Sequence, residues 1–536
     1  MQKVIVIGVD GATLDLMEPW MDQGELPHFD TIRKQGVYGK LRSTIPHYSA
    51  PAWTSIVTGC NPGKHGIYDF FRTDSFSKKL VNSRYRKAPA LWSYLSDQGK
   101  RSIVVNVPGT YPPEPIHGVM ITGLLTPSLD SAFTHPSHVK KDLVKGKLGD
   151  YELEQVAVDD LPKHLSARYA PGRLRDKVNA MTVSHATVTA NLMTTYDWDF
   201  TMVVFRGLDD VQHLVWDHKE LVLSCYKKAD EYIGKLMASF PDAFIVVVSD
   251  HGFGKPKKYL YVNNVLYNTG FLKTFVDPDY NIDSVMMRWF DKLSRLFFHL
   301  LPMEKLVRSS LGRKLILAGG RSRTIDFSRT KAVYHSVCSR GIRINFRDKY
   351  DQGTVRREDY EHLRNELITL FQGLRDPETG ERVVKKVHRW EDVYGKNAVN
   401  DPLDLILDVE QGYGTQELLG SSEKKRPKKA PLPILTAPGF YDWMGDHTPY
   451  GVVFMYGKGV KENHRITASV TDVVPTVLAV MNLPLPEYLD GTVVEDAFVK
   501  PPPIKKIWWE PHISKEKFLS KAEMEKIGKL KQTFQS

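Results

Sequence analysis

The amino-acid sequence predicts an α/β fold with a mostly parallel central sheet and helices on both faces. Short apolar runs alternate with helix-like stretches from residue 1 to about 262, and this βαβα order is typical of such sheets. Acidic and histidine side chains follow several of the apolar runs, which is where open α/β sheets bind ligands. The 536 residues suffice for one large core with insertions, or for two to three domains.

Residues 1–264 are predicted to form the first part of the core. Four apolar runs read as buried strands: Val4–Val9, Ser102–Val107, Thr201–Phe205 and Ala243–Ser249. Helix-like stretches lie between them, including Ala90–Gln98 and Leu221–Phe240. The strands therefore need helical crossovers, which favours parallel pairing.

Residues 265–330 differ from this pattern and read as an inserted cap or lid region. In Val285–Leu301, large apolar side chains lie at helical spacing with basic residues among them, which predicts a basic amphipathic helix. Such a helix packs on its own domain, covers the site as a lid, or lies on an anionic membrane surface. The sequence leaves these alternatives open.

Residues 331–500 return to an α/β pattern and are expected to complete the core. The predicted strands are Ile342–Phe346, Asp404–Val409 and Gly451–Gly457, and the predicted helices are Asp359–Leu374 and Asp472–Met481. Residues 501–536 begin with three prolines and continue as a basic tail that contains Trp508 and Trp509.

The charge distribution and the cysteine content indicate which kinds of binding partner and which cellular compartment to expect. The net charge of +10 is concentrated in residues 285–325, in residues 423–430 and in the tail. These segments either are solvated surface or attract an anionic partner such as a membrane surface or a phosphorylated substrate, and nucleic acid is not expected. Cys60, Cys225 and Cys338 lack the spacing of a disulfide framework or zinc knot. With no secretory leader pattern and no run of about 18 apolar residues, we expect a cytoplasmic protein, with peripheral membrane association left open.

Three segments carry side chains suited to binding metal ions. The run VIVIGVD ends at Asp10, GLDDVQHLVWDH contains Asp209 and His213, and VVVSDHGFG contains Asp250 and His251. The four-residue spacing of Asp209 and His213 places both on one face of a helix, which suits two ligands of one metal. A further histidine, His447, lies just before the apolar run Gly451–Gly457.

The donor types indicate which cations would fit. Carboxylates and imidazoles without thiolates favour Zn²⁺ or Mn²⁺, and the histidines make Mg²⁺ less suitable. Two such cations about 4 Å apart form a clamp for in-line displacement at phosphorus. The hydroxyl-rich segment TIPHYSAPAWTSIVTGCNPGKHGIYDF is the candidate source of a nucleophile.

Together these segments resemble the alkaline phosphatase superfamily, in its type I phosphodiesterase/nucleotide pyrophosphatase branch, and within it the predicted phosphohydrolase/phosphomutase proteins. The resemblance covers most of residues 1–495 and includes NPGKHGI, DPETGE and TDVVPTVLAVMNLPLPEYLDG. It implies two divalent cations, of which one is bound by Asp10, Asp250 and His251 together with the nucleophile. The ligands that it implies for the other cation are Asp209, His213 and His447.

The same resemblance points to the nucleophile and to the phosphate-binding residues. Relatives place the nucleophile ten residues before the glycine of a Thr-Gly pair, which here selects Ser49 and leaves Thr54 as the alternative. Diesterases of this type carry an asparagine shortly after HGI, but this chain has Phe70 there, with Asp69 before it. Lys64 and His65 either hold the phosphate instead or only shape their loop.

The predicted function is phosphoric ester hydrolysis, by a phosphodiesterase or phosphatase, through a metal-activated Ser49 and a covalent intermediate. A phosphomutase with the same site and a non-catalytic membrane-surface protein on this fold are the alternatives. Sulfate-ester hydrolysis is disfavoured, because Trp53 stands where the sulfatase pattern has arginine. The expected substrate is a small phosphorylated molecule.

Overall fold

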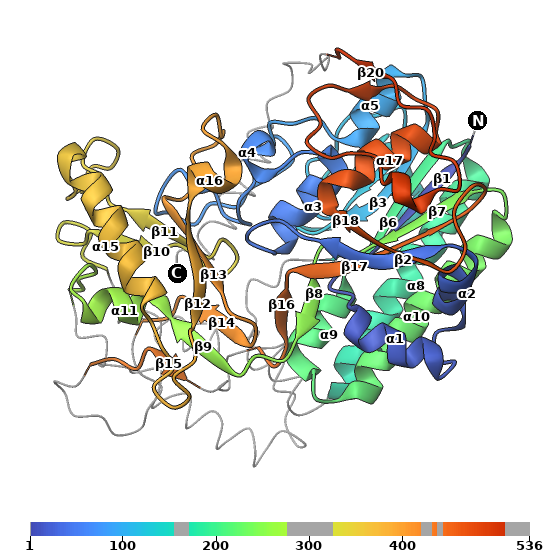
Figure 1. Ribbon diagram of the computed structural model, residues 1–536. Coiled ribbons are helices and arrows are strands. Elements are labelled where there is room, and N and C mark those ends of the chain that lie inside the picture. The colour runs from blue at the N-terminus through green and yellow to red at the C-terminus, as the bar shows by residue number, and fades with distance from the viewer. Residues whose placement is uncertain (1, 155–170, 276–324, 420–430, 437–442, 510–536) are drawn as a thin grey trace.

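The computed structural model describes residues 2–154, 171–275, 325–419, 431–436 and 443–509. Figure 1 shows two bodies that lie side by side, the larger built on the central sheet and the smaller on residues from the middle of the chain. The predicted helix Val285–Leu301, the basic run 423–430 and most of the basic tail lie outside the described residues.

In the described part of the chain, the central sheet has nine strands in the order β18-β2-β17-β7-β1-β6-β3-β4-β5. Strands β1, β6, β7, β3 and β4 pair in parallel, as do β18 and β2, whereas β17 and the edge strand β5 pair antiparallel. The predicted α/β fold with a mostly parallel sheet is confirmed. The strand bounds are β1 Val4–Val9, β2 Val37–Arg42, β3 Ser102–Val107, β4 Gly118–Thr122, β5 Thr134–His135, β6 Phe200–Phe205, β7 Phe244–Val248, β17 Tyr450–Tyr456 and β18 His464–Ser469.

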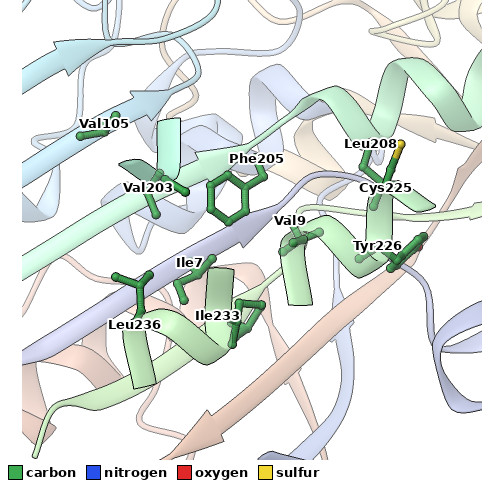
Figure 2. Packing of buried hydrophobic residues seen from close by; sticks show 14 of the residues in the cluster. Ile7, Val9, Val105, Val203, Phe205, Leu208, Cys225, Tyr226, Ile233 and Leu236 are labelled. Atoms are coloured by element: carbon green, nitrogen blue, oxygen red, sulfur yellow. The ribbon is translucent and has the colours of Figure 1, made fainter. Parts of the chain in front are cut away.

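Helices cover both faces of this sheet because successive strand residues point to opposite sides. In β1, Ile5 and Ile7 join one hydrophobic cluster, while Val4 and Val6 join the other. Figure 2 shows part of the first cluster, in which side chains of β1, β6 and α10 interdigitate. The first face is covered by α1 (Leu14–Asp22), α2 (Pro27–Gln35), α8 (Pro171–Thr195), α9 (Gly207–Val215) and α10 (Lys219–Ser239), and the second by α3 (Ser49–Thr58), α5 (Leu91–Asp97) and α17 (Val473–Val480).

The smaller body has its own sheets and its own hydrophobic cluster. One sheet is antiparallel, in the order β10-β11-β13-β12, and packs with α15 (Tyr360–Gln372). A second sheet has the order β14-β9-β15. The bounds are β9 Lys258–Tyr261, α11 Val262–Asn268, β10 Ala332–Tyr334, β11 Gly341–Ile344, β12 Val384–Arg389, α16 Trp390–Tyr394, β13 Leu405–Val409, β14 Tyr413–Gln416 and β15 Leu435–Thr436.

The predicted segment 331–500 contributes to both bodies. Its strands β10 to β15 form the smaller body, whereas β17 and β18 enter the central sheet. The smaller body also begins before residue 265, with β9. An apolar alternation predicts a strand, but it does not predict the strand's hydrogen-bonding partner.

Shorter elements connect the two bodies and complete the larger one. Strands β8 (Gly252–Gly254) and β16 (Asp446–Thr448) pair antiparallel where the bodies meet (Figure 1). The remaining elements are α4 Pro62–His65, α6 His138–Val144, η2 Arg357–Asp359, η3 Val470–Asp472, β19 Leu485–Pro486, η4 Glu495–Ala497 and β20 Lys506–Ile507. Among the described helices, none combines the length and apolar character that crossing a membrane requires.

The contact between β1 and α3 can be tested at Gly8. A Cβ atom at Gly8 would lie 2.4 Å from Trp53 Cη2 and 2.8 Å from Val204 Cγ2. We expect Gly8→Ala to lower the free energy of unfolding by about 1–3 kcal/mol, because a packed core resists added volume. Urea denaturation measures this change. Gly172→Ala is the control, since its added Cβ would meet only Arg175 Nη2 at 3.7 Å; equal stability of the two variants would contradict the prediction.

Candidate active site

The candidate ligands gather at one edge of the central sheet because of its strand order. Strand β1 lies between the parallel strands β6 and β7, so the carboxyl ends of all three meet. Asp10 follows β1, Asp209 lies in the first turn of α9 after β6, and Asp250 and His251 follow β7. His447 reaches the same place from β16, which pairs with β8 just after His251.

Asp10, Asp250 and His251 form what we call the first ligand group. All three are fully buried, and one donor atom from each lies within 4.8 Å of the others. His251 Nε2 lies 3.1 Å from Asp250 Oδ2 and 3.5 Å from Asp10 Oδ1. Ser49 Oγ lies 3.1 Å from the same nitrogen. The serine hydroxyl therefore stands beside the atoms that would hold a cation.

Asp209, His213 and His447 form the second ligand group, with the same 4.8 Å limit between donor atoms. His447 Nε2 lies 2.9 Å from His213 Nε2 and 3.2 Å from Asp209 Oδ1, and His213 Nε2 lies 3.3 Å from that oxygen. Ligand atoms around a tetrahedral Zn²⁺ are about 3.4 Å apart, given bond lengths near 2.1 Å. The spacing of this group is thus close to that of ligands around one cation.

The hydrogen bonds of the three imidazoles identify the nitrogen that faces each group. The Nδ1 atoms of His213, His251 and His447 lie 2.9, 3.2 and 3.2 Å from backbone carbonyl oxygens. Because a carbonyl oxygen only accepts, each Nδ1 carries the proton and each Nε2 presents a lone pair, as in metal-binding histidines. The acceptors are the carbonyls of Gly445, Gly252 and His47 respectively.

The two ligand groups are adjacent. The rings of His251 and His447, one from each group, stack with a centroid distance of 3.5 Å and an interplanar angle of 19°. Ser49 is the first residue of α3 and is 4% exposed. A molecule that contacts Ser49 would therefore lie close to both groups.

Buried negative charge dominates the electrostatics of the site. Burial raises the pKa of Asp10 well above its ordinary value, and the carboxylates of Asp250 and Asp209 raise it further. Burial also raises the pKa of Asp250 to about 7, and Asp209 adds to that effect. For Asp209 itself burial acts in the same direction, but the neighbouring His213 and His447 hold its pKa well below the usual range.

The residues present fit divalent cations in both groups. Within the described chain, Asp10 Oδ1 and Asp250 Oδ2 are buried and accept no hydrogen bond, which is costly unless a cation satisfies them. In the second group, the lone pairs of His213 and His447 face each other across 2.9 Å, which requires a proton or a cation between them. Burial lowers the pKa of His251 and of His447, which favours the neutral imidazole that binds metal.

Two supporting side chains that we did not predict orient the carboxylates. Trp53 Nε1 donates to Asp10 Oδ2 at 2.9 Å, and Arg206 Nη1 donates to Asp209 Oδ2 at 3.2 Å. Each bond leaves the Oδ1 atom of that aspartate free to face its ligand group. The signal for Trp53 was its position one helical turn after Ser49, and the signal for Arg206 was its place directly before GLDD.

Arg340 belongs to the smaller body and lies close to the site. It lies between β10 and β11, has a φ of 46°, and is 2% exposed. Its guanidinium carbon lies 5.4 Å from the ring centroid of Tyr48, which precedes Ser49, and its Nη2 lies 3.8 Å from Asp446 Oδ2. No periodicity or motif marks this arginine in the sequence, because its role depends on a contact between the two bodies.

The alternative nucleophile and the predicted phosphate ligands are engaged elsewhere. Thr54 Oγ1 donates to the carbonyl of Ala50 within its own helix. Lys64 Nζ pairs with Asp490 and donates to the carbonyl of Tyr488, both at 2.7 Å.

His65 and the HGI segment also serve the structure of the loop. His65 Nε2 bonds with Ser55 Oγ at 2.9 Å, and its Nδ1 accepts from Ile67 N, so neither ring nitrogen remains for a phosphate. Asp69 accepts hydrogen bonds from Ser336 Oγ and from a backbone N–H, and Phe70 packs in an apolar cluster. These contacts favour the loop-shaping alternative over phosphate binding for Lys64 and His65.

Fold and site together define an α/β protein with two candidate metal sites at the strand ends of its central sheet. The chain belongs to the type I phosphodiesterase/nucleotide pyrophosphatase family, since the model of that family matches residues 4–415. This is a family of phosphoric ester hydrolases, and the predicted resemblance is confirmed.

Individual relatives are distant. Mouse ectonucleotide pyrophosphatase/phosphodiesterase family member 1 is 24% identical over 296 residues, or 51% of this chain and 27% of the mouse protein. Its human counterpart is 22% identical over 291 residues, or 51% of this chain and 26% of the human protein. The match thus spans about a quarter of the length of these curated relatives.

Solved structures of the ectonucleotide pyrophosphatase/phosphodiesterase group also match. Human family member 5 has a TM-score of 0.48 at 14% identity and covers 93% of this chain and 100% of its own. Murine family member 5 in complex with AMP has a TM-score of 0.47 at 13% identity and covers 90% of this chain and 96% of its own.

The support that Trp53 gives to Asp10 can be tested by metal binding. We expect Trp53→Phe to weaken the affinity of the first ligand group for Zn²⁺ roughly 10- to 100-fold, as the loss of such a supporting bond does elsewhere. Competition with a chromophoric chelator measures it. Trp92→Phe is the matched control, because Trp92 is also fully buried and its Nε1 donates to Glu114 at 2.9 Å. Equal losses in both variants would show that the bond to Asp10 has no special role.

Metal binding should also depend on pH. Below about pH 7, Asp250 holds a proton that a cation must displace, so the affinity for Zn²⁺ should fall as the pH drops from about 7.5 to about 5.5. The loss is up to about tenfold per pH unit for each displaced proton. Burial alone would lower the pKa of His213, but Asp209 outweighs this and raises it, so the second group loses affinity in the same direction. Calorimetry in buffers of different ionisation enthalpy counts the protons released; an affinity independent of pH would contradict this.

Proposed function

We propose that this protein hydrolyses phosphoric esters with two divalent cations and with Ser49 as the nucleophile. The observation that carries the proposal is the position of Ser49 Oγ, 3.1 Å from His251 Nε2 in the first ligand group. The ring of His251 stacks on His447 of the second group, so the two groups adjoin each other. Zn²⁺ is the cation that we propose, with Mn²⁺ as the alternative.

The residues of the site suggest how the ester bond breaks. Bound cations would lower the pKa of the Ser49 hydroxyl and offset the negative charge of the phosphoryl group. Ser49 Oγ, having lost its proton to solvent, bonds to phosphorus while the bond from phosphorus to the leaving oxygen breaks. Water then hydrolyses the phosphoserine ester and restores the hydroxyl.

The start of α3 favours this chemistry. Ser49 occupies the first position of the helix, where backbone N–H groups have no acceptor within the helix. Pro51 supplies no N–H, so the donors of this first turn are those of Ser49 and Ala50. Together with the helix dipole, they favour an anionic phosphoryl group at this end of α3.

The substrate class follows in part from the family. Its name and the names of its relatives support a small phosphoric diester or pyrophosphate as substrate. Phe70 provides no amide for a phosphoryl oxygen, so phosphate monoesters remain in the proposal. A phosphomutase would use the same residues, and analysis of the products from a sugar phosphate separates it from a hydrolase.

Membrane association stays a separate prediction with one observation in its favour. Trp508 is 80% exposed and lies just after Lys505 and Lys506, a combination suited to an anionic lipid surface. The three cysteines are unpaired, which supports a reducing compartment such as the cytoplasm.

The identity of the nucleophile can be tested with two hydroxyl variants. We expect Ser49→Ala to lower kcat for bis(4-nitrophenyl) phosphate by roughly a thousandfold or more, because the attacking oxygen is removed. Metal content, measured by mass spectrometry, should stay near two per chain. Thr54→Ala lies one turn further along α3 and should keep kcat within about threefold. Full activity of the Ser49 variant with loss in the Thr54 variant would reverse the assignment.

A further inference from the structure

A cavity of about 270 Å³ lies where the two bodies meet, beside the second ligand group. Its wall is built from residues 254–257, 411–413 and 446–448. The first of these segments follows β8, the second joins β13 to β14 in the smaller body, and the third is β16. The cavity thus draws on both bodies.

The cavity adjoins the second ligand group through His447. This residue lines the cavity and also presents Nε2 to His213 and Asp209. A molecule in the cavity would therefore lie next to that group. The proposed reaction needs such a place, because the part of the ester that is not attacked must also be held.

The charges on the wall favour an anion. Lys255 and Lys257 lie on the wall, and their side chains are 61% and 64% exposed. Lys255 Nζ is 2.7 Å from Asp217, and Lys257 Nζ is 3.7 Å from Glu381. Exposed ion pairs of this kind contribute about 0–1 kcal/mol, so either lysine can exchange its partner for a ligand at little cost.

Two other polar residues of the wall, Asp446 and Tyr413, already have partners. Asp446 Oδ1 accepts from the backbone N–H of His447, and its Oδ2 faces the guanidinium of Arg340 at 3.8 Å. The hydroxyl of Tyr413 lies 3.0 Å from Asp376 Oδ2. The charge of Asp446 is offset by Arg340, so an anion in the cavity would compete only with the exposed partners Asp217 and Glu381 for the two lysines.

We propose that this cavity binds a second phosphate group of the substrate, through Lys255 and Lys257. The preferred substrates are then phosphoric esters that carry a further phosphate on the part that Ser49 does not attack. This assignment rests on the proposed function, and it names the substrate class that the same site selects.

The experiment compares two esters that differ by one phosphate. Thymidine 5′-(4-nitrophenyl phosphate) and its 3′-phosphorylated counterpart release the same nitrophenol, and kcat/KM is measured for both with the Zn²⁺-loaded protein. We expect the 3′-phosphorylated ester to be preferred about tenfold or more, and the preference to shrink at high salt because the lysines are exposed. Lys255→Ala and Lys257→Ala should each reduce the preference roughly three- to tenfold, and the double variant should remove it.

Lys235→Ala is the matched control. Lys235 is 58% exposed and pairs with Glu231 at 2.6 Å, much as Lys255 pairs with Asp217, but it lies on α10 outside the cavity wall. The preference should not change in this variant. An unchanged preference in the Lys255/Lys257 double variant, or no preference in the unmodified protein, would overturn the assignment.

A binding measurement separates this inference from the proposed function. Calorimetry compares thymidine 3′,5′-bisphosphate with thymidine 5′-monophosphate and requires no turnover. If neither ester is hydrolysed while the bisphosphate binds tighter and loses that advantage in the double variant, the proposed function fails and the cavity assignment stands. If the bisphosphate binds no tighter than the monophosphate, the cavity assignment fails even when hydrolysis is observed.

Discussion

Three buried carboxylates and three buried imidazoles meet at one edge of the central sheet, and this concentration of ligand atoms is the constraint on which the rest of the site depends. Burial first, and then the neighbouring carboxylates, raise the pKa of Asp10 and of Asp250, so the charged forms are disfavoured when no cation is bound. Folding tolerates this arrangement because the surrounding sheet and helices bury a large apolar core. The buried carboxylates therefore lower the stability of the fold unless cations bind them.

The supporting contacts explain why the ligand atoms point inward. Trp53 and Arg206 each bind the outer oxygen of an aspartate, and three backbone carbonyls hold the Nδ1 atoms of the histidines. Trp53 lies in α3 and Gly252 in β8, whereas Arg206, His47 and Gly445 lie in the segments just before α9, α3 and β16. Trp53 also connects the chemistry to the core, because the same indole packs against Gly8 of β1 and shares α3 with Ser49.

The smaller body supplies residues that lie around the two ligand groups. Its Arg340 lies against Tyr48 and Asp446, the residues that precede Ser49 and His447. Its turn at residues 411–413 closes one side of the cavity. The wall of the cavity therefore combines residues of the smaller body with the segment that joins β8 to β9.

The sequence by itself determined the α/β class and the strands that precede Asp10 and Asp250, and its resemblance to a known family supplied the division of the candidate ligands into two groups. Apolar runs predict which segments of the chain are buried, and Asp and His residues next to such runs are unusual. Only the tertiary structure decided that β10 to β15 form a separate body, that Lys64 and His65 belong to loop contacts, and that Arg340 and the lysines of the cavity lie near the site. Strand pairing and the contact between the two bodies depend on residues far apart in sequence. A local sequence pattern does not predict such distant partners.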